Sequence, residues 1–367
     1  MEKGNAVKSY DHVYYIDFLR IAASFLVIVN HTITGICFDY KPDSFEWYIS
    51  ALLFIICKTA VPIFLMITGS LLLHKSAQDY RKTVKRILRM LAVLIAWSYI
   101  YYCYEYKGIP TLKKTWDMLV NIFTNKPAIT ALWYLYALIG VYIMLPFISK
   151  MTLAFDDKDY LIFLGLWGLF NGLIPEIDAL FGGKKITFVS YFQYQLFIGW
   201  PGYCVLGYYL SAGGRQILHT AKEGNTAKGS LLIKIALAFA ALFFGFFSII
   251  YTGKPNVVDN AKYFIFIILS ALIYYTFVQA EDRFKKRLLS GGRFASAVQS
   301  VSEATFGIYL CHRLVRDILL NDLSISPQIR VLMDSVLGIL LFDSILYFLC
   351  FTVISFLRRI PIVRKIV

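Results

Sequence analysis

The sequence has too little charge for a soluble protein of its length. Asp, Glu, Lys and Arg make up only 16% of the 367 residues, whereas hydrophobic residues make up 58%. A soluble domain of this size exposes far more charge, because its surface faces water. No polar stretch is long enough to form a soluble domain. We therefore expect a single membrane domain over residues 1–367, with short loops and with membrane lipid around it.

Several other features are missing. The six cysteines are scattered in or beside apolar segments without metal-type spacing, so we expect neither disulfides nor a metal site. No small-residue cleavage pattern follows the first apolar segment, which we expect to remain in the protein as a helix. No internal repeat is evident, and this absence counts against several common transporter folds.

Long apolar segments dominate what is present. A membrane-spanning helix needs about twenty mostly apolar residues. The sequence therefore predicts an all-α integral membrane protein, a bundle of about ten transmembrane helices. The ten segments lie near residues 15–37, 48–73, 87–105, 130–149, 159–176, 193–211, 231–251, 261–280, 301–320 and 331–357.

The distribution of charge predicts the orientation of the helices. The 37 Lys and Arg residues exceed the 23 Asp and Glu residues, and dense basic clusters occur at residues 81–89, 283–287 and 358–365. Because these clusters lie between or after apolar segments, they indicate membrane topology and not nucleic-acid binding. We expect both termini in the cytoplasm, as short tails at residues 1–13 and 358–367.

The first apolar segment carries ionisable side chains, which are costly inside a membrane and are therefore candidate functional residues. Arg20 and His31 are eleven residues apart, so they share one face of a helix at a separation of about 16 Å. Asp17 is three residues from Arg20 and can pair with it, and Asn30 lies beside the histidine. A histidine that is merely hydrogen-bonded within the bundle is the alternative for His31.

Two further groups of side chains are candidates. Arg86 and Arg89 begin the third segment, where guanidinium groups suit phosphate; plain positive-inside anchoring is the alternative. His312 lies near mid-membrane in the ninth segment and either meets His31 across the bundle or packs passively. Arg313 and Arg316 follow it, and extension of both side chains to the outer headgroups is the structural alternative.

Trp133 and Tyr134 open the fourth segment on its expected outer side. These two rings can stack on a sugar, so they are candidate substrate-binding residues together with Asn30. An aromatic belt at the membrane interface explains them equally well.

The sequence resembles a known family along nearly its whole length. The first segment, DFLRIAASFLVIVNH, has an arginine, ten residues and then a histidine, and an R-x-x-R pair follows at Arg86 and Arg89. The stretches PIFLMITGSLLL, LWYLYALIGVYIMLPFI, VLGYYL and FGIYLCH then occur in the expected order. Together these motifs resemble the acyltransferase 3 family, integral membrane enzymes that decorate bacterial surface polysaccharides.

The resemblance implies a ten-helix domain in the bacterial cell (inner) membrane. It implies a cytoplasmic acyl-CoA donor, usually acetyl-CoA, and a hydroxyl of a cell-surface or lipid-linked glycan as acceptor, with no metal. By carry-over, His31 is the catalytic histidine, Arg20 its partner and His312 a second catalytic candidate, whereas Arg86 and Arg89 hold the CoA phosphates. Whether His31 acts as general base or accepts the acyl group stays open.

Two departures from the family matter. Some members carry a fused extracellular domain; this sequence stops at Val367, so we expect direct transfer or a separate polysaccharide-assembly partner. Arg313 stands where relatives usually have proline. A transporter or flippase for a polysaccharide, amino acid or lipid is the competing class, because intramembrane charges suit it. Such a protein does not require the R-x10-H and R-x-x-R motifs.

Overall fold

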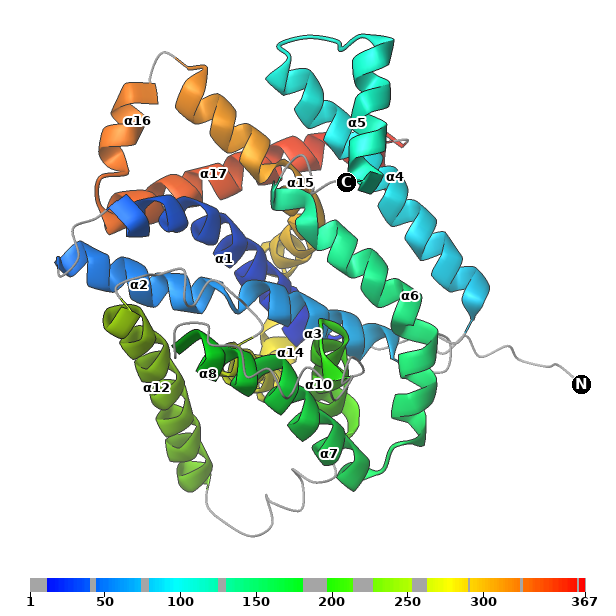
Figure 1. Ribbon diagram of the computed structural model, residues 1–367, viewed down its shortest axis with the longest axis vertical. Helices are drawn as coiled ribbons and strands as arrows, with labels where there is room; N and C mark the ends of the chain where they lie inside the picture. Colours follow the sequence, from blue (N-terminus) through cyan, green and yellow to red (C-terminus); the bar gives the residue numbers. More distant parts are fainter. Residues whose placement is uncertain are drawn as a thin grey trace, which may run out of the picture.

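The computed structural model describes residues 12–39, 44–73, 79–124, 130–180, 197–213, 227–252, 263–289, 291–323, 326–361 and 363–366. Within these ranges the chain folds into a bundle of helices without any strand (Figure 1). The prediction of an all-α protein is therefore confirmed for the described part of the chain. Most of the expected N-terminal tail, residues 1–11, lies outside it.

The helices follow the predicted apolar segments. In chain order they are α1 (Tyr14–Asp39), α2 (Phe45–Cys57), α3 (Ala60–Leu72), α4 (Tyr80–Glu105), α5 (Leu112–Thr124), α6 (Trp133–Ala154), α7 (Asp157–Trp167), α8 (Ile174–Leu180), α10 (Pro201–Tyr208), α12 (Ala227–Thr252), α13 (Phe264–Gln279), α14 (Glu281–Leu289), α15 (Arg293–Asn321), α16 (Ser326–Leu332) and α17 (Val336–Leu357). π-Helical turns join α7 to α8 (η3, Gly168–Leu173) and follow α10 (η5, Tyr209–Gly213).

Six of these spans are long and apolar enough to cross a membrane. Within the described residues they are Tyr14–Thr34, Phe45–Leu72, Tyr80–Glu105, Trp133–Ala154, Asp157–Leu180 and Val336–Leu357. The pair α13–α14, bent by 48°, makes a seventh if it is counted as one broken span. Each of the ten predicted segments contains a helix, but α10, the apolar part of α12 and the charged α15 do not meet these criteria alone. The fold fits a multi-pass membrane protein; ten spans and two cytoplasmic termini stay predictions.

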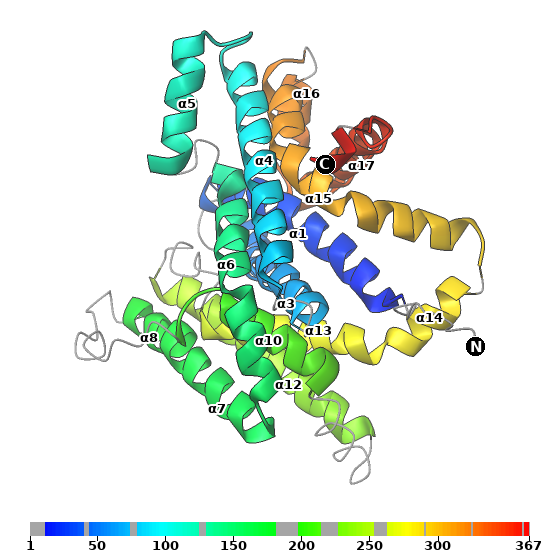
Figure 2. The same cartoon turned by 90° about the vertical axis from the view of Figure 1, so that its right-hand side faces the viewer.

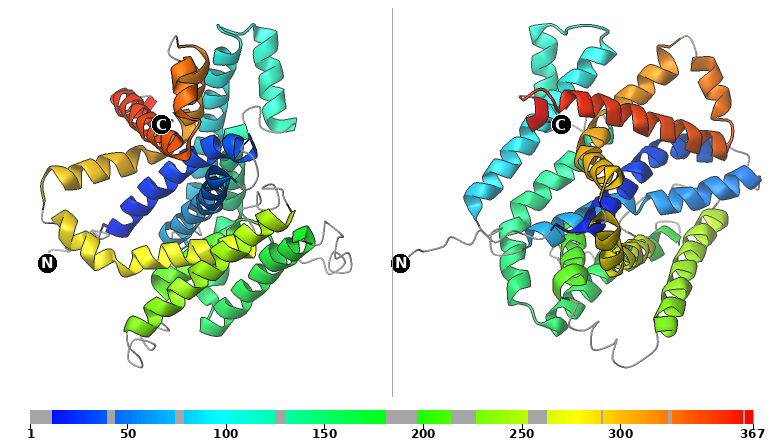
Figure 3. Two further views of the ribbon diagram at one scale, coloured as in Figure 1. Left: turned by 90° about the vertical axis from the view of Figure 1, so that its left-hand side faces the viewer. Right: turned by 180° about the vertical axis from the view of Figure 1, so that it is seen from behind.

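Helix α1 lies at the centre of the bundle. It packs against α2, α3, α15 and α17, and Figures 1 and 3 show it between α17 and α2. Its first amides are capped from a distant helix, because the backbone N–H groups of Tyr14 and Tyr15 donate to the Glu281 carboxylate at 3.1 and 2.7 Å. Asp17 accepts hydrogen bonds from Ser302 on α15 and from His12. No hydrogen bond or ion pair joins Asp17 to Arg20 in the described structure, although the two charges still attract one another.

The second predicted span is interrupted between α2 and α3, and α3 then packs very closely on α10. A Cβ added at Gly69 would lie 1.9 Å from the backbone oxygen of Cys204, and one added at Gly207 would lie 2.2 Å from that of Met66. Glycine at both positions therefore lets the two backbones touch. This close contact fixes the position of α3 against α10, and other side chains of α3 line a cavity.

Candidate active site

A cavity of about 620 Å³ opens between α1, α3, α4, α6 and α15. Figure 2 shows α4 and α6 running beside one another along this part of the bundle. The volume lies within the range typical of small-molecule sites. Its lining combines basic side chains with apolar and aromatic ones: Arg20, Arg86, Arg89, Arg358 and Arg364; Glu303, Ser302, Thr305 and Thr68; Tyr134, Tyr142 and Tyr309; and a set of Val, Ile, Leu, Met and Phe side chains.

One end of the cavity is strongly basic. Five arginines reach it, from α1, α4 and the segment after α17, whereas Glu303 supplies the one carboxylate among the described residues that line it. That carboxylate accepts a hydrogen bond from the Arg358 Nη2 at 2.6 Å. The Arg86 Nη1 is buried and has no hydrogen-bond partner in the described structure. The excess of guanidinium groups suits a ligand that carries several negative charges, such as phosphates.

The other end of the cavity lies close to two histidines. The lining follows α1 from Arg20 to Val27 and α15 from Ser302 to Tyr309, about 10 Å along each helix. His31 is four residues beyond Val27, one helical turn farther along α1. His312 is three residues beyond Tyr309, and their ring centroids are 6.0 Å apart.

The two histidine rings are stacked, with centroids 5.2 Å apart. His312 is buried, and its Nδ1 lies 2.5 Å from the backbone oxygen of Tyr309. Because a carbonyl oxygen only accepts, Nδ1 must carry the proton, and Nε2 then has a free lone pair in the neutral ring. That Nε2 is buried and finds no partner among the described residues. The structure thus brings His312 into contact with His31 across the bundle, as the first of the two alternatives for His312 expects.

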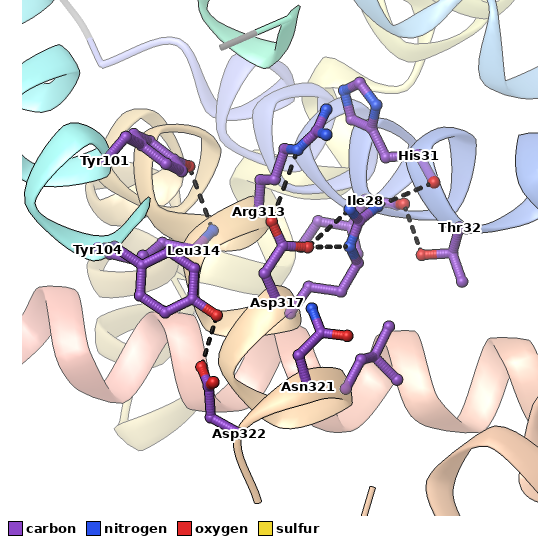
Figure 4. Close-up of polar contacts among 12 residues, drawn as sticks. Ile28, His31, Thr32, Tyr101, Tyr104, Arg313, Leu314, Asp317, Asn321 and Asp322 are labelled. Carbon is purple, nitrogen blue, oxygen red and sulfur yellow. Dashed lines mark hydrogen bonds and ion pairs between the residues drawn. The ribbon is translucent and has the colours of Figure 1, made fainter. Parts of the chain in front are cut away.

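A charged network surrounds the backbone of His31 (Figure 4). The Arg316 Nη1 donates to the His31 carbonyl oxygen at 3.1 Å, and its Nη2 lies 2.8 Å from the carboxylate of Asp317. The same carboxylate pairs with the Arg313 Nε at 3.7 Å. Arg316 thus turns toward the backbone of α1, whereas a third of the Arg313 side chain stays exposed. The alternative in which the two side chains extend to the outer headgroups stays open.

A second carboxylate is buried beside this network. Asp343 on α17 is fully buried and accepts a hydrogen bond from the Thr32 hydroxyl at 2.8 Å. Its other oxygen, Oδ2, is buried and has no partner in the described part of the chain. Thr32 follows His31 directly, so α17 contacts the stretch of α1 that carries the histidine.

The three predicted substrate-binding residues lie in different surroundings. The Asn30 Oδ1 is buried beside His31 without a hydrogen-bond partner among described residues. Tyr134 lines the cavity and meets Tyr309 edge to face, with ring centroids 5.6 Å apart. Trp133 instead packs on Trp200, at a centroid distance of 5.4 Å, and its role in binding substrate stays a prediction.

Several residues of the site were not predicted from the sequence. Asp343 is a lone carboxylate in an apolar segment, and the cost of burying such a group is a signal that could have found it. Asp317 follows Arg313 by four residues, which is a helical pairing distance. Tyr309 lies in the FGIYLCH motif, but the motif does not mark it as a residue of the cavity. Arg364 carries no comparable signal, because only the tertiary fold brings it to the cavity.

Comparisons with known proteins agree with the motifs. The family model described as "Acyltransferase domain", that of the acyltransferase 3 family, matches residues 13–358. The chain is 24% identical over 367 residues to a protein of Enterococcus faecalis named "Amino-acid racemase", covering 95% of this chain but only about half of that protein. No solved structure matches the chain. Because the family model spans nearly the whole sequence, this protein belongs to the acyltransferase 3 family of membrane acyltransferases.

Proposed function

We propose that this protein is an acyl-CoA-dependent O-acyltransferase of a bacterial cell membrane. The donor is a cytoplasmic acyl-CoA, with acetyl-CoA as the expected form. The acceptor is a hydroxyl group of a cell-surface or lipid-linked glycan. A separate polysaccharide-assembly protein delivers or receives this glycan.

One observation carries the proposal. A single cavity has five arginines at one end and stops one helical turn short of a stacked histidine pair at the other. Its middle is lined by apolar side chains of α1, α3 and α6. A CoA thioester has the matching order of groups: phosphates, a slim pantetheine arm and a reactive thioester. In this arrangement Arg86 and Arg89 bind phosphates, Arg20 faces the same end, and the thioester approaches His31.

The transfer itself needs one proton acceptor. His31 takes the proton of the acceptor hydroxyl as its oxygen bonds to the carbonyl carbon of the thioester. The carbon–sulfur bond then breaks, and the proton passes from His31 to the departing thiolate, so CoA leaves as a thiol. His312, held by the Tyr309 carbonyl, offers the lone pair of Nε2 beside this reaction. Asn30 and Tyr134 face the acceptor and the acyl group.

The test is equilibrium binding of acetyl-CoA to the purified protein in detergent. The wild type is compared with an Arg86→Ala/Arg89→Ala variant. Arg283→Gln, an exposed charge on α14, serves as the control. We expect saturable binding by the wild type and the control, and a loss of about tenfold or more in the double variant, because two charge-assisted contacts to phosphate are removed.

Two outcomes contradict the proposal. Folded, monodisperse wild-type protein that does not bind acetyl-CoA overturns the donor assignment and favours the transporter class. Equal binding by wild type and double variant leaves the arginine pair as a topological anchor only. A positive result is followed by transfer of labelled acetyl groups to cell-surface glycan in membranes that contain the protein.

A further inference from the structure

A second basic chamber adjoins the cavity. It has a volume of about 590 Å³ and is lined by Arg89, Arg358, Arg359, Pro361 and Arg364. Three of these arginines, Arg89, Arg358 and Arg364, also line the first cavity. The two spaces therefore share one wall of guanidinium groups. Within the described structure no carboxylate lines the second chamber.

The chain after α17 is built into this wall. The amide of Arg364 donates to the Ile360 carbonyl, and that of Ile366 to the Val363 carbonyl, each at 2.9 Å. The Trp97 Nε1 on α4 then donates to the Ile366 carbonyl at 3.0 Å. These bonds hold the described part of the segment beside α4. The fold thus places the backbone of this segment, from which its arginines extend.

We propose that Arg358, Arg359 and Arg364, together with Arg89, form a second anion site, which binds a phosphate group of the donor distant from its reactive end. This inference rests on the proposed function. In a CoA thioester the group is the 3′-phosphate of the nucleotide, whereas Arg86 faces the diphosphate nearer the apolar arm. A phosphate monoester carries between one and two negative charges at neutral pH. Glu303 offsets the charge of Arg358, yet a chamber lined by four arginines, with no carboxylate among its described lining residues, still favours such a group.

The continuity of the two spaces favours a donor phosphate over a phospholipid headgroup. Arg358 lines both spaces, and its hydrogen bond to Glu303 on α15 joins the second chamber to the wall of the first. A ligand whose charges occupy both spaces is therefore bound by one connected set of arginines. A phospholipid headgroup also carries a phosphate, so it is the alternative ligand of the chamber. The experiment must distinguish the two ligands.

A substitution of Arg359 tests the second chamber without affecting the first cavity. Arg359 lines only the second chamber, and its side chain is exposed, so its replacement leaves the first cavity and the packing unchanged. In nanodiscs of zwitterionic lipid, binding of CoA and of dephospho-CoA is measured for the wild type, Arg359→Gln, Arg359→Lys and the control Arg283→Gln. The two ligands differ only in the 3′-phosphate.

We expect the wild type and Arg283→Gln to bind CoA about tenfold or more tightly than dephospho-CoA, the order expected for one charged contact. Arg359→Gln loses most of this preference because its affinity for CoA falls, while its affinity for dephospho-CoA stays unchanged. Arg359→Lys retains the larger part of the preference for CoA, since lysine keeps the positive charge.

Other results overturn the inference. The inference is overturned if the wild type binds CoA and dephospho-CoA with equal affinity. It is also overturned if Arg359→Gln lowers the affinity for both ligands equally. A variant that keeps its preference for CoA but no longer retains anionic phospholipid, measured by native mass spectrometry, assigns the chamber to lipid instead. A wild type that binds neither ligand contradicts the proposed function, which distinguishes the two failures.

Discussion

The imidazole rings of His31 and His312 lie stacked, with their centroids 5.2 Å apart, although the residues belong to α1 and α15, which are distant in the sequence. The two helices are tied together on both sides of this contact. Ser302 donates to Asp17 at 2.7 Å, and the Arg316 guanidinium donates to the His31 carbonyl at 3.1 Å. These tertiary bonds fix the depth of one histidine relative to the other, so the ring contact is a property of the α1–α15 pair.

Replacement of His31 by alanine is expected to lower acetyl transfer roughly 10²–10⁴-fold, the usual contribution of a positioned general base. Donor affinity should not change, because the arginines proposed to bind the donor phosphates lie at the other end of the cavity. Rates are measured with labelled acetyl-CoA and binding by calorimetry. Transfer at the wild-type rate by a folded His31→Ala protein would remove His31 from the mechanism.

His312 offers a sharper test, because one substitution separates its two ring nitrogens. In His312→Asn the side-chain amide takes the place of Nδ1–H and still donates to the Tyr309 carbonyl, but no counterpart of Nε2 remains. We expect thermal stability near that of the wild type, kcat lowered about a hundredfold and an unchanged KM for the donor.

The comparison variant for this test is His312→Ala, which removes both nitrogens. It should show the same loss of kcat together with a destabilisation of about 1–3 kcal/mol, since the buried carbonyl loses its donor. Wild-type kcat in His312→Asn would mean that His312 only supports the structure.

The close contact of α3 with α10 predicts an effect on stability. Gly69→Ala places a methyl group 1.9 Å from the Cys204 backbone oxygen, so the helices must separate, at a cost of about 1–3 kcal/mol or more. Gly140→Ala on α6 is the matched control, because nothing lies within 4 Å of its added Cβ. That change should be neutral or slightly stabilising. Thermal unfolding in detergent compares the two, and equal melting temperatures would contradict the observed packing.

The sequence predicts the elements better than their contacts. Apolar segments of spanning length place a helix in each of the ten expected regions, because a membrane forces backbone polar groups to pair within each segment. Side-chain pairs within one helix are predicted less reliably than the helices themselves. Asp17 and Arg20 have suitable helical spacing, yet Asp17 bonds to Ser302, which is distant in the sequence. A tertiary partner replaced the local one, and the sequence contains no measure of that competition.

The candidate site likewise contains residues that the sequence predicts and residues that only the tertiary structure reveals. The cost of a charge within the membrane predicts Arg20, whereas guanidinium chemistry and the R-x-x-R resemblance predict Arg86 and Arg89; all three line the cavity. The arginines that follow α17 look like ordinary positive-inside charges. Arg364 reaches the cavity only because its segment turns back and is bonded to Trp97, a contact between distant parts of the chain.

Asp343 provides the last prediction, through its hydrogen bond with Thr32. Thr32→Val removes the hydroxyl that donates to this buried carboxylate, so we expect a destabilisation of about 1–2 kcal/mol. Thr34→Val is the matched control two residues along α1. Its hydroxyl donates only to the Asn30 carbonyl of the same helix, so its loss should change the unfolding free energy by less than about 0.5 kcal/mol.

A double variant distinguishes a lost bond from lost packing. Thr32→Val combined with Asp343→Leu removes the donor and the carboxylate together, so no buried polar group is left unpaired by the first change. If the bond accounts for the effect, the two substitutions are coupled, and Thr32→Val costs little in the Asp343→Leu background. If Thr32→Val is as destabilising in that background as in the wild type, the hydroxyl contributes through its own packing, and the Thr32–Asp343 bond adds nothing to stability.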